Sequence, residues 1–341
     1  MTVCSGFNVY HTQISANHDD WVSGVAVLDN LVLTGCYDNT VNLWTLEGQK
    51  TLVIPSHSGP VKAVAWLDQE TFVSASHDQT INMFQWNKES NSVEGVNTCR
   101  GHERSVECVA VWKGAEGSNT VFASGSFDNT VKLWGGKLVE EEQVPDGGTQ
   151  PKKAKAAGRG VTRTPMQTLG GHKEAVSGLA WLGEGDLASA SWDHTIKIWD
   201  MEMGGLKTEL VGNKAFFSIS YSNLNRTLLA TSADRSVRMY DPRSQEGSLV
   251  KALFTSHVGW VSSVSWAPQG ENLFVSASHD QLVKMWDNRS YKTPLYELTG
   301  EVECYKIHGI LSSLFQATLR RCCAVTGLTW HILLAEGLIT T

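Results

Sequence analysis

An eleven-residue pattern recurs six times along the 341-residue chain, and this repetition constrains the fold more than any other feature. Every copy carries an aspartate at its fifth position, and successive aspartates are separated by 40, 50, 65, 41 and 46 residues. A period of roughly 40–45 residues with a few longer joints indicates one repeated supersecondary unit. The copies are TGCYDNTVNLW (34–44), SASHDQTINMF (74–84), SGSFDNTVKLW (124–134), SASWDHTIKIW (189–199), ATSADRSVRMY (230–240) and SASHDQLVKMW (276–286).

A second pattern precedes the copies, namely a histidine followed four residues later by an apolar alternating run. Before the fifth copy, Asn213 stands where the others have histidine. Runs such as VSGLAW and TIKIW alternate with period two, which predicts short strands joined by tight turns. Four-stranded sheets repeated radially form a β-propeller. We therefore expect an all-β WD-repeat propeller with six recognisable blades.

The stretch SASWDHTIKIWD (189–200) contains Ser, His and Asp, the components of a hydrolase triad. A triad needs one exposed nucleophile beside one base in a cleft, whereas this trio recurs next to a bulky aromatic residue. We expect a structural network in which His172 joins Asp193 to a strand serine and Trp199 closes the chain of bonds. Alternation places Ser189 and Ser191 on the same face, so either could be the serine. Such networks satisfy buried polar groups, and no enzymatic activity is expected.

The same network is expected in the other blades, although two of them depart from the pattern. Blade two ends in Phe84 instead of Trp, and blade five has Asn213 and Tyr240, so its network should be weaker. The expected network residues are His18, Asp38, Trp44, His57, Asp78, His102, Asp128, Trp134, His172, Ser189, Ser191, Asp193, Trp199, Asp234, His257, Asp280 and Trp286.

Aromatic residues gather at two positions of the repeat that should lie on one face. These are the residue before each turn aspartate and the residue before each first strand. Exposed aromatic side chains of this kind are typical of protein-binding surfaces; the alternative is that they pack on neighbouring loops and seal the face. The candidate partner-binding residues are Trp21, Tyr37, Phe127, Trp192, Phe216 and Trp260.

A 30-residue insertion, 135–164, separates blades three and four. It begins acidic and becomes basic, and its low apolar content predicts a disordered loop. The basic part is either a solvated loop or a nuclear-import or RNA-contacting patch. The residues of that patch are Lys152, Lys153, Lys155, Arg159 and Arg163.

The two ends of the chain fall outside the repeat. We divide the sequence into an N-terminal segment (1–16), the propeller (17–300) and an off-pattern tail (301–341) without a turn aspartate or terminal tryptophan. The propeller is expected to close incompletely, with its gap partly filled by the two end segments. Cys and His residues in the tail have no zinc-site spacing, so neither a metal nor a cofactor is expected.

Charge and cysteine content narrow the function classes. The net charge of −7 argues against a general nucleic-acid binder. Seven cysteines without framework spacing fit a reducing compartment, and the N-terminus lacks a secretory signal. No apolar run predicts a membrane span, so the chain is expected in the cytosol or nucleus.

The segments between the repeats are more specific than the repeats themselves. NHDDWVSGVAV, WTLEGQK, RTPMQTLGGHKEAVS, SASWDHTIKIWD, DRSVRMYDPRSQEGSLV, TSHVGWVSSVSW and DNRSYKTPLYELTG together resemble the eukaryotic WD repeat-containing protein 12 family over residues 17–300. The resemblance implies a scaffold in large (60S) ribosomal subunit biogenesis, found in the nucleolus and nucleoplasm. It implies pescadillo and the block-of-proliferation WD-repeat protein as partners in the PeBoW complex, with a role in maturing 28S-type and 5.8S rRNA on pre-60S particles.

Two further implications qualify this resemblance. Family members carry an N-terminal ubiquitin-like domain that docks on midasin, and because only about sixteen residues precede the first repeat, midasin docking is not expected here. The family's last blade is also absent from the sequence pattern. The alternative function is a WD-repeat adaptor in another pathway, such as substrate presentation to a ubiquitin ligase.

Overall fold

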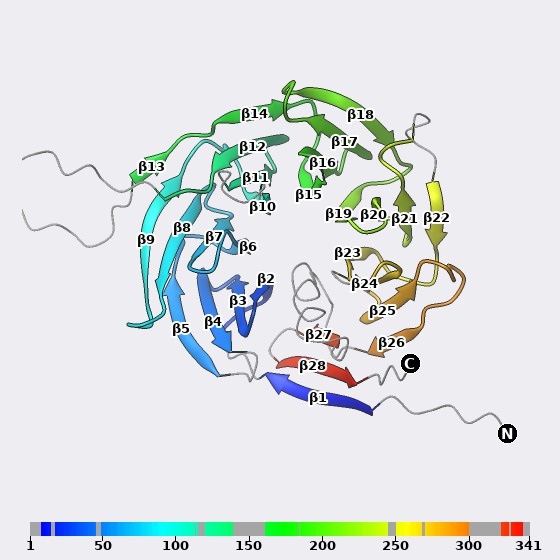
Figure 1. Ribbon diagram of the computed structural model, residues 1–341, viewed down its shortest axis with the longest axis horizontal. Helices are drawn as coiled ribbons and strands as arrows, with labels where there is room; N and C mark the ends of the chain where they lie inside the picture. Colours follow the sequence, from blue (N-terminus) through cyan, green and yellow to red (C-terminus); the bar gives the residue numbers. More distant parts are fainter. Residues whose placement is uncertain are drawn as a thin grey trace, which may run out of the picture.

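The computed structural model describes residues 8–14, 18–45, 49–112, 114, 120–138, 161–183, 185–244, 250–267, 270–299, 322–326 and 329–336. Within these ranges, six sheets, each built on four antiparallel strands, are arranged as a ring, and the first strand of each lies nearest the axis (Figure 1). One of the six has a fifth strand that pairs in parallel at its outer edge. The expected all-β propeller of six WD-repeat blades is confirmed.

Each blade has four strands in chain order from the axis outward. Blades one to three contain β2 (Val22–Leu28), β3 (Leu31–Cys36), β4 (Thr40–Thr45) and β5 (Lys50–Pro55); β6 (Val61–Trp66), β7 (Thr71–Ser76), β8 (Ile81–Asn87) and β9 (Ser92–Cys99); and β10 (Val106–Trp112), β11 (Val121–Ser126), β12 (Thr130–Gly135) and β14 (Gln167–Gly170). Blades four to six contain β15 (Val176–Leu182), β16 (Asp186–Ser191), β17 (Thr195–Asp200) and β18 (Gly205–Val211); β19 (Phe216–Ser222), β20 (Thr227–Ser232), β21 (Val237–Tyr240) and β22 (Val250–Phe254); and β23 (Val261–Trp266), β24 (Leu273–Ser278), β25 (Leu282–Asp287) and β26 (Tyr296–Thr299).

The core is divided into layers between neighbouring blades. Side chains of blade one, such as Leu33, pack against Phe72 of blade two, and those of blade four, such as Ile198, pack against Leu228 of blade five. Three further clusters join blades two to three, three to four and five to six. Because each layer is buried between two neighbouring sheets, the period-two alternation of the strands specifies their register.

The insertion after blade three returns to the ring through a short strand, β13 (Val161–Arg163). This strand pairs parallel with β9, the outermost strand of blade two, before the chain continues into β14 of blade three. The segment after the insertion therefore links two neighbouring blades along their outer edge (Figure 1).

The two ends of the chain form one three-stranded sheet. β1 (Asn8–Ile14) pairs antiparallel with β28 (Thr329–Glu336), which pairs antiparallel with β27 (Cys322–Thr326). This sheet lies between blades one and six (Figure 1). It has three strands where each blade has four, and it brings the first and last described segments of the chain together.

Candidate partner-binding face

Blade four shows how the repeated Ser, His, Asp and Trp residues connect. His172 lies in the loop before β15, and its Nδ1 is 2.9 Å from Asp193 Oδ2 in the turn between β16 and β17. Its Nε2 is 2.7 Å from Ser189 Oγ, which also accepts a 2.8 Å hydrogen bond from Trp199 Nε1. The network therefore uses Ser189. The hydroxyl of Ser191 instead donates to the Glu174 carbonyl and accepts from the Asp193 amide.

The proton positions in this network follow from its acceptor-only group. The Asp193 carboxylate can only accept, so His172 donates to it from Nδ1–H. In this neutral tautomer Nε2 accepts from the Ser189 hydroxyl, which in turn accepts from the Trp199 indole. Ser189 is fully buried under Trp199. A hydroxyl without access to a substrate cannot act as a nucleophile, so the geometry of this trio is structural.

The same connections recur in three more blades. The histidine Nδ1 to aspartate distance is 3.4 Å in blade one, 2.7 Å in blade three and 2.8 Å in blade six. In these blades the hydroxyl beneath the histidine is Thr34, Ser124 or Ser276, and it accepts from an indole Nε1 at 2.8–2.9 Å. The histidine and indole partners are His18 with Trp44, His102 with Trp134, and His257 with Trp286.

The turn that presents each aspartate has a constrained backbone. The residue after the aspartate adopts a positive φ in all six blades, between 65° and 70°. This left-handed conformation is costly for residues with a Cβ. The aspartate stabilises it by accepting a bond from the amide of the residue two positions later and, in blades one to five, from the hydroxyl of that residue. In blade four these donors are Thr195 N at 2.9 Å and Thr195 Oγ1 at 2.6 Å.

Hydrogen bonding keeps the turn aspartates ionised. Burial pulls the pKa of the Asp193 carboxyl upward, but bonds from His172, Thr195 and the Lys173 amide outweigh it and hold the pKa well below its usual range. The other five turn aspartates show a lowered pKa for the same balance of causes. Burial also lowers the pKa of His18 and His257, more than the neighbouring carboxylates raise it.

Blade two lacks the indole donor. Phe84 stacks on Phe72 with ring centroids 5.1 Å apart. Ser74 Oγ keeps the 2.8 Å contact with His57 Nε2, and the bond from an indole that the other networks have is missing here. His57 Nδ1 still lies 3.0 Å from Asp78 Oδ2.

Blade five is built differently, and the prediction that Asn213 occupies the histidine position is wrong. The register of β19 aligns Ala215 with the residue before each first strand, which places Gly212 three residues earlier at the histidine position. A Cβ on Gly212 would lie 2.4 Å from Cζ of Phe216, so the Phe216 ring occupies space next to this backbone and excludes a histidine there. Arg238 replaces the imidazole and pairs with the Asp234 carboxylate.

The prediction that Phe216 is an exposed partner-binding residue is also wrong. Its side chain is fully buried because it stands one residue later than Trp21 and Trp260 do in their repeats, and a shift of one residue in a strand moves a side chain to the opposite face. Phe217, the next residue, lies half-buried at the pocket described below.

The remaining aromatic candidates lie on one face. We define the rim as the residue before each first strand together with the residue before each turn aspartate. In every blade the amide of the second donates to the carbonyl of the first, at 2.8–3.0 Å. Trp21, Trp192 and Trp260 are 52%, 38% and 56% exposed, and Tyr37 and Phe127 are half-buried.

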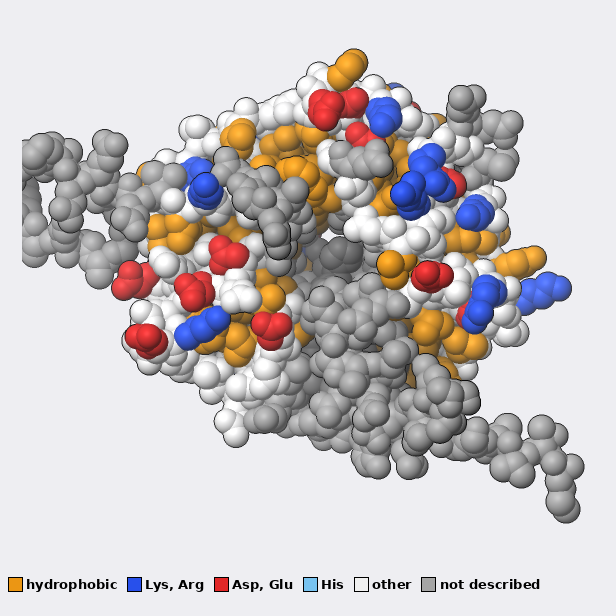
Figure 2. Space-filling model, viewed as in Figure 1, with side chains coloured by type: hydrophobic (Ala, Val, Ile, Leu, Met, Phe, Trp, Pro, Cys, Tyr) orange, Lys and Arg blue, Asp and Glu red, His pale blue; other side chains and the backbone are white. Residues whose placement is uncertain are grey.

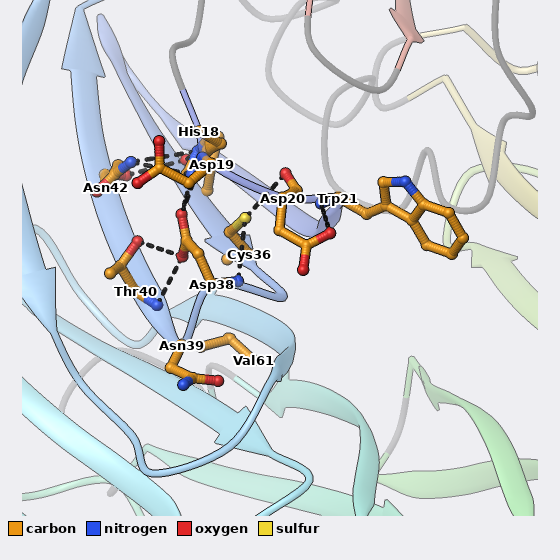
Figure 3. A network of polar contacts seen from close by, with 12 residues as sticks. His18, Asp19, Asp20, Trp21, Cys36, Asp38, Asn39, Thr40, Asn42 and Val61 are labelled. Carbon is orange, nitrogen blue, oxygen red and sulfur yellow. Dashed lines mark hydrogen bonds and ion pairs between the residues drawn. The ribbon is translucent and has the colours of Figure 1, made fainter.

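The rim rings contact other aromatic rings on the same face, across two blade boundaries and once within blade one. Phe127 of blade three meets Trp192 of blade four edge-on at 5.1 Å, and Phe217 of blade five meets Trp260 of blade six at 6.0 Å. In blade one, Trp21 and Tyr37 lie 6.0 Å apart, and the Trp21 side chain extends away from the polar network (Figure 3). The rim therefore presents large, partly rigid aromatic surface, the material of protein-binding hot spots.

One group of possible metal ligands occurs among the described side chains, namely His18, Cys36 and Asp38 (Figure 3). Cys36 Sγ lies 3.1 Å from the Asp20 carbonyl and 3.5 Å from the Asp38 amide. Ser191 makes the equivalent two contacts in blade four. Burial raises the pKa of the Cys36 thiol to about 12, whereas a metal ligand must be a thiolate. Cys36 therefore substitutes for a structural serine.

The predicted basic patch is only partly visible. Lys152, Lys153, Lys155 and Arg159 lie outside the described residues. Arg163 is half-buried in β13, and its guanidinium donates to the carbonyls of Gly135 at 2.8 Å and Lys137 at 2.7 Å. On the described part of the face in Figure 2, Lys and Arg side chains lie among Asp and Glu side chains and hydrophobic ones. No helix in the described parts of the chain is long and apolar enough to cross a membrane.

Comparison with known proteins places these features in a family context. The WD domain, G-beta repeat family matches residues 10–45, 48–85, 94–135, 163–200, 204–241 and 247–287. The chain is 48% identical over 294 residues to the ribosome biogenesis protein WDR12 homolog of Ixodes scapularis, covering 83% of this chain and 68% of that protein. The homologs of Culex quinquefasciatus and Drosophila erecta are 48% and 47% identical over 289 and 290 residues. The matches cover 83% and 84% of this chain and 66% of each of those two proteins.

Proposed function

This chain belongs to the WDR12 family of WD40-repeat ribosome biogenesis proteins, and we propose that it acts as a non-catalytic scaffold in assembly of the large (60S) ribosomal subunit. The observation that carries the proposal is the identity of 48% over 294 residues, which is 83% of this chain. A generic propeller signature alone would support the fold and not the pathway.

The proposed partners are pescadillo and the block-of-proliferation WD-repeat protein, acting with this chain in a PeBoW-type complex on pre-60S particles. In this proposal the complex supports maturation of 28S-type and 5.8S rRNA in the nucleolus and nucleoplasm. The rim is the proposed contact surface for the second WD-repeat protein, because it combines three exposed tryptophans with backbone positions fixed by the polar networks. We further propose that contact with precursor rRNA is indirect, since the net charge of −7 favours a protein partner over a phosphate backbone.

The test is affinity purification of the tagged chain from cell extract at near-physiological salt, with bound proteins and RNA identified. A rim variant carrying Trp21→Ala and Trp260→Ala is compared with a control carrying Tyr291→Ala. Tyr291 is similarly exposed, at 53%, but lies in the loop between β25 and β26 at the opposite end of its strands from the rim.

The parent chain and the control are expected to recover both partners and large-subunit precursor rRNA, and the rim variant is expected to lose them. Recovery of cullin-type ligase subunits without precursor rRNA would instead support the adaptor function. Recovery of chaperones alone by the parent chain would refute both.

A further inference from the structure

A pocket on the rim face is lined by residues of blades three, four, five and six. Four aromatic rings line it, those of Phe127, Trp192, Phe217 and Trp260, together with His279 and Glu107. They come from four successive blades, so the packing of blades three to six side by side assembles the pocket. Its volume is about 230 Å³. Small-molecule sites usually have roughly 300–1,000 Å³, so this pocket suits a single side chain better than a cofactor.

The pocket combines aromatic faces with negative charge. Glu107 is the one carboxylate among its lining residues. Its Oε1 accepts a 2.6 Å bond from Ser105 Oγ, which orients the carboxylate. Five ionised turn aspartates add negative charge to the same face, whereas the charge of the sixth, Asp234, is balanced by Arg238. Aromatic rings attract cations through their electron-rich faces, so both components favour a positively charged guest.

The rim already contains one interaction of this kind. Lys62 Nζ lies 4.4 Å from the centroid of the Tyr37 ring and 2.6 Å from its hydroxyl oxygen. The ammonium group of Lys62, in blade two, thus contacts the aromatic ring of Tyr37, in blade one. The residues lining the pocket include neither lysine nor arginine, so a cation for the pocket must come from another molecule.

We propose that this pocket binds one arginine side chain of the partner protein, with the guanidinium between the aromatic rings and directed towards Glu107. Arginine is favoured over lysine because its planar, weakly hydrated guanidinium stacks on aromatic faces and can bond a carboxylate through two N–H groups. The inference rests on the proposed function in that it takes the rim as the partner-binding face, and it specifies the chemistry of the partner residue.

The test uses the isolated full chain labelled with 5-fluorotryptophan and followed by ¹⁹F NMR. Variants Trp21→Phe, Trp192→Phe and Trp260→Phe assign three of the thirteen tryptophan signals. The probe is the blocked peptide acetyl-Gly-Arg-Gly-amide. Matched peptides contain lysine, or citrulline, which has nearly the same shape as arginine without its charge. Trp21 is not among the residues that line the pocket, and its signal provides the internal control.

We expect saturable shifts of the Trp192 and Trp260 signals with the arginine peptide, none with the citrulline peptide and about tenfold weaker binding after Glu107→Gln. Equal shifts with citrulline, equal or tighter binding of lysine, an unchanged affinity in Glu107→Gln, or no saturable shift up to the solubility limit would each overturn the assignment. The arginine, lysine and citrulline peptides are compared on the unaltered chain, so a misfolded variant cannot produce the differences between them. Binding of arginine without recovery of the ribosomal partners would refute the proposed function and leave the pocket assignment standing.

Discussion

Replacing Ser189 with alanine should destabilise the propeller more than replacing Ser74, although both side chains are fully buried and chemically identical. Ser189 Oγ bonds both His172 Nε2 at 2.7 Å and Trp199 Nε1 at 2.8 Å. Ser74 occupies the same position in blade two, where Phe84 offers no donor and only His57 Nε2 is bonded by the hydroxyl, at 2.8 Å.

The magnitude follows from the number of buried groups left without a partner. Each costs about 1–3 kcal/mol, so Ser189→Ala should reduce the free energy of unfolding by about 2–6 kcal/mol and Ser74→Ala by about 1–3 kcal/mol. Trp199→Phe converts blade four to the arrangement of blade two. In that background, Ser189→Ala should lose its extra cost and resemble Ser74→Ala.

Urea denaturation measures these differences, and hydrogen exchange of β16, β17, β7 and β8 shows whether the loss is confined to the altered blade. Blade-resolved exchange is needed because repeat proteins can unfold in parts. Equal costs for the two serine variants, or a cost of Ser189→Ala that is unchanged by Trp199→Phe, would refute the interpretation that the indole and imidazole share one hydroxyl.

Three further predictions concern pH, blade five and the thiol. Because the pKa of His18 and His257 is lowered on folding, the unfolded chain binds more protons below about pH 6.5. The free energy of unfolding should therefore fall as the pH drops through this range, and fall further below about pH 4 as the turn aspartates protonate. A flat profile between about pH 7 and 5 would contradict this. Gly212→Ala should be strongly destabilising through the 2.4 Å approach to Phe216, and Phe216→Val should restore much of the loss in the double variant, as thermal unfolding would show. Cys36→Ser should change stability by less than about 1 kcal/mol, and the parent chain should gain no thermal stability from Zn²⁺, because the position makes the same contacts that serine makes in blade four.

Sequence alone could predict the blades because two signals agreed in almost every repeat. The period-two runs located the strands, and the turn aspartate with its upstream histidine located the loops at one end of each sheet. Side-chain periodicity could not choose between Ser189 and Ser191, since both point to the same face. The choice depends on how far along the strand the indole and imidazole reach, which only the packed sheet defines.

Blade five shows where repeat alignment fails. Counting back from the alternating run placed Asn213 at the histidine position and Phe216 on the rim, and both assignments were one residue out of register. The error has a physical cause: the larger Phe216 side chain stands where Val176 stands in blade four, and its ring excludes any side chain at Gly212. Loss of the histidine together with an arginine at position 238 was an available signal for the replacement ion pair.

The strands of the C-terminal tail carried no usable periodicity. CCAVT and TWHILLAE are short, mostly continuous apolar runs, which do not distinguish a buried strand from a buried helix. CCAVT pairs with TWHILLAE, and the central strand TWHILLAE also pairs with β1, a contact between segments more than 300 residues apart. Local pattern contains no information about such a contact, so the tail appeared simply to lack the repeat.

The polar networks and the rim are two consequences of one loop arrangement. The His-bearing loop and the Asp-bearing turn are joined by the imidazole–carboxylate bond, and the residues beside that bond are the ones whose amide and carbonyl join across the rim. A network buried beneath Trp199 can therefore fix the backbone of Trp192 and Ala175 without using their side chains. This separation leaves the rim positions free to carry recognition chemistry. Stability variants such as Ser189→Ala should consequently weaken partner binding only as far as they loosen the loop, whereas Trp260→Ala should weaken it with the free energy of unfolding little changed.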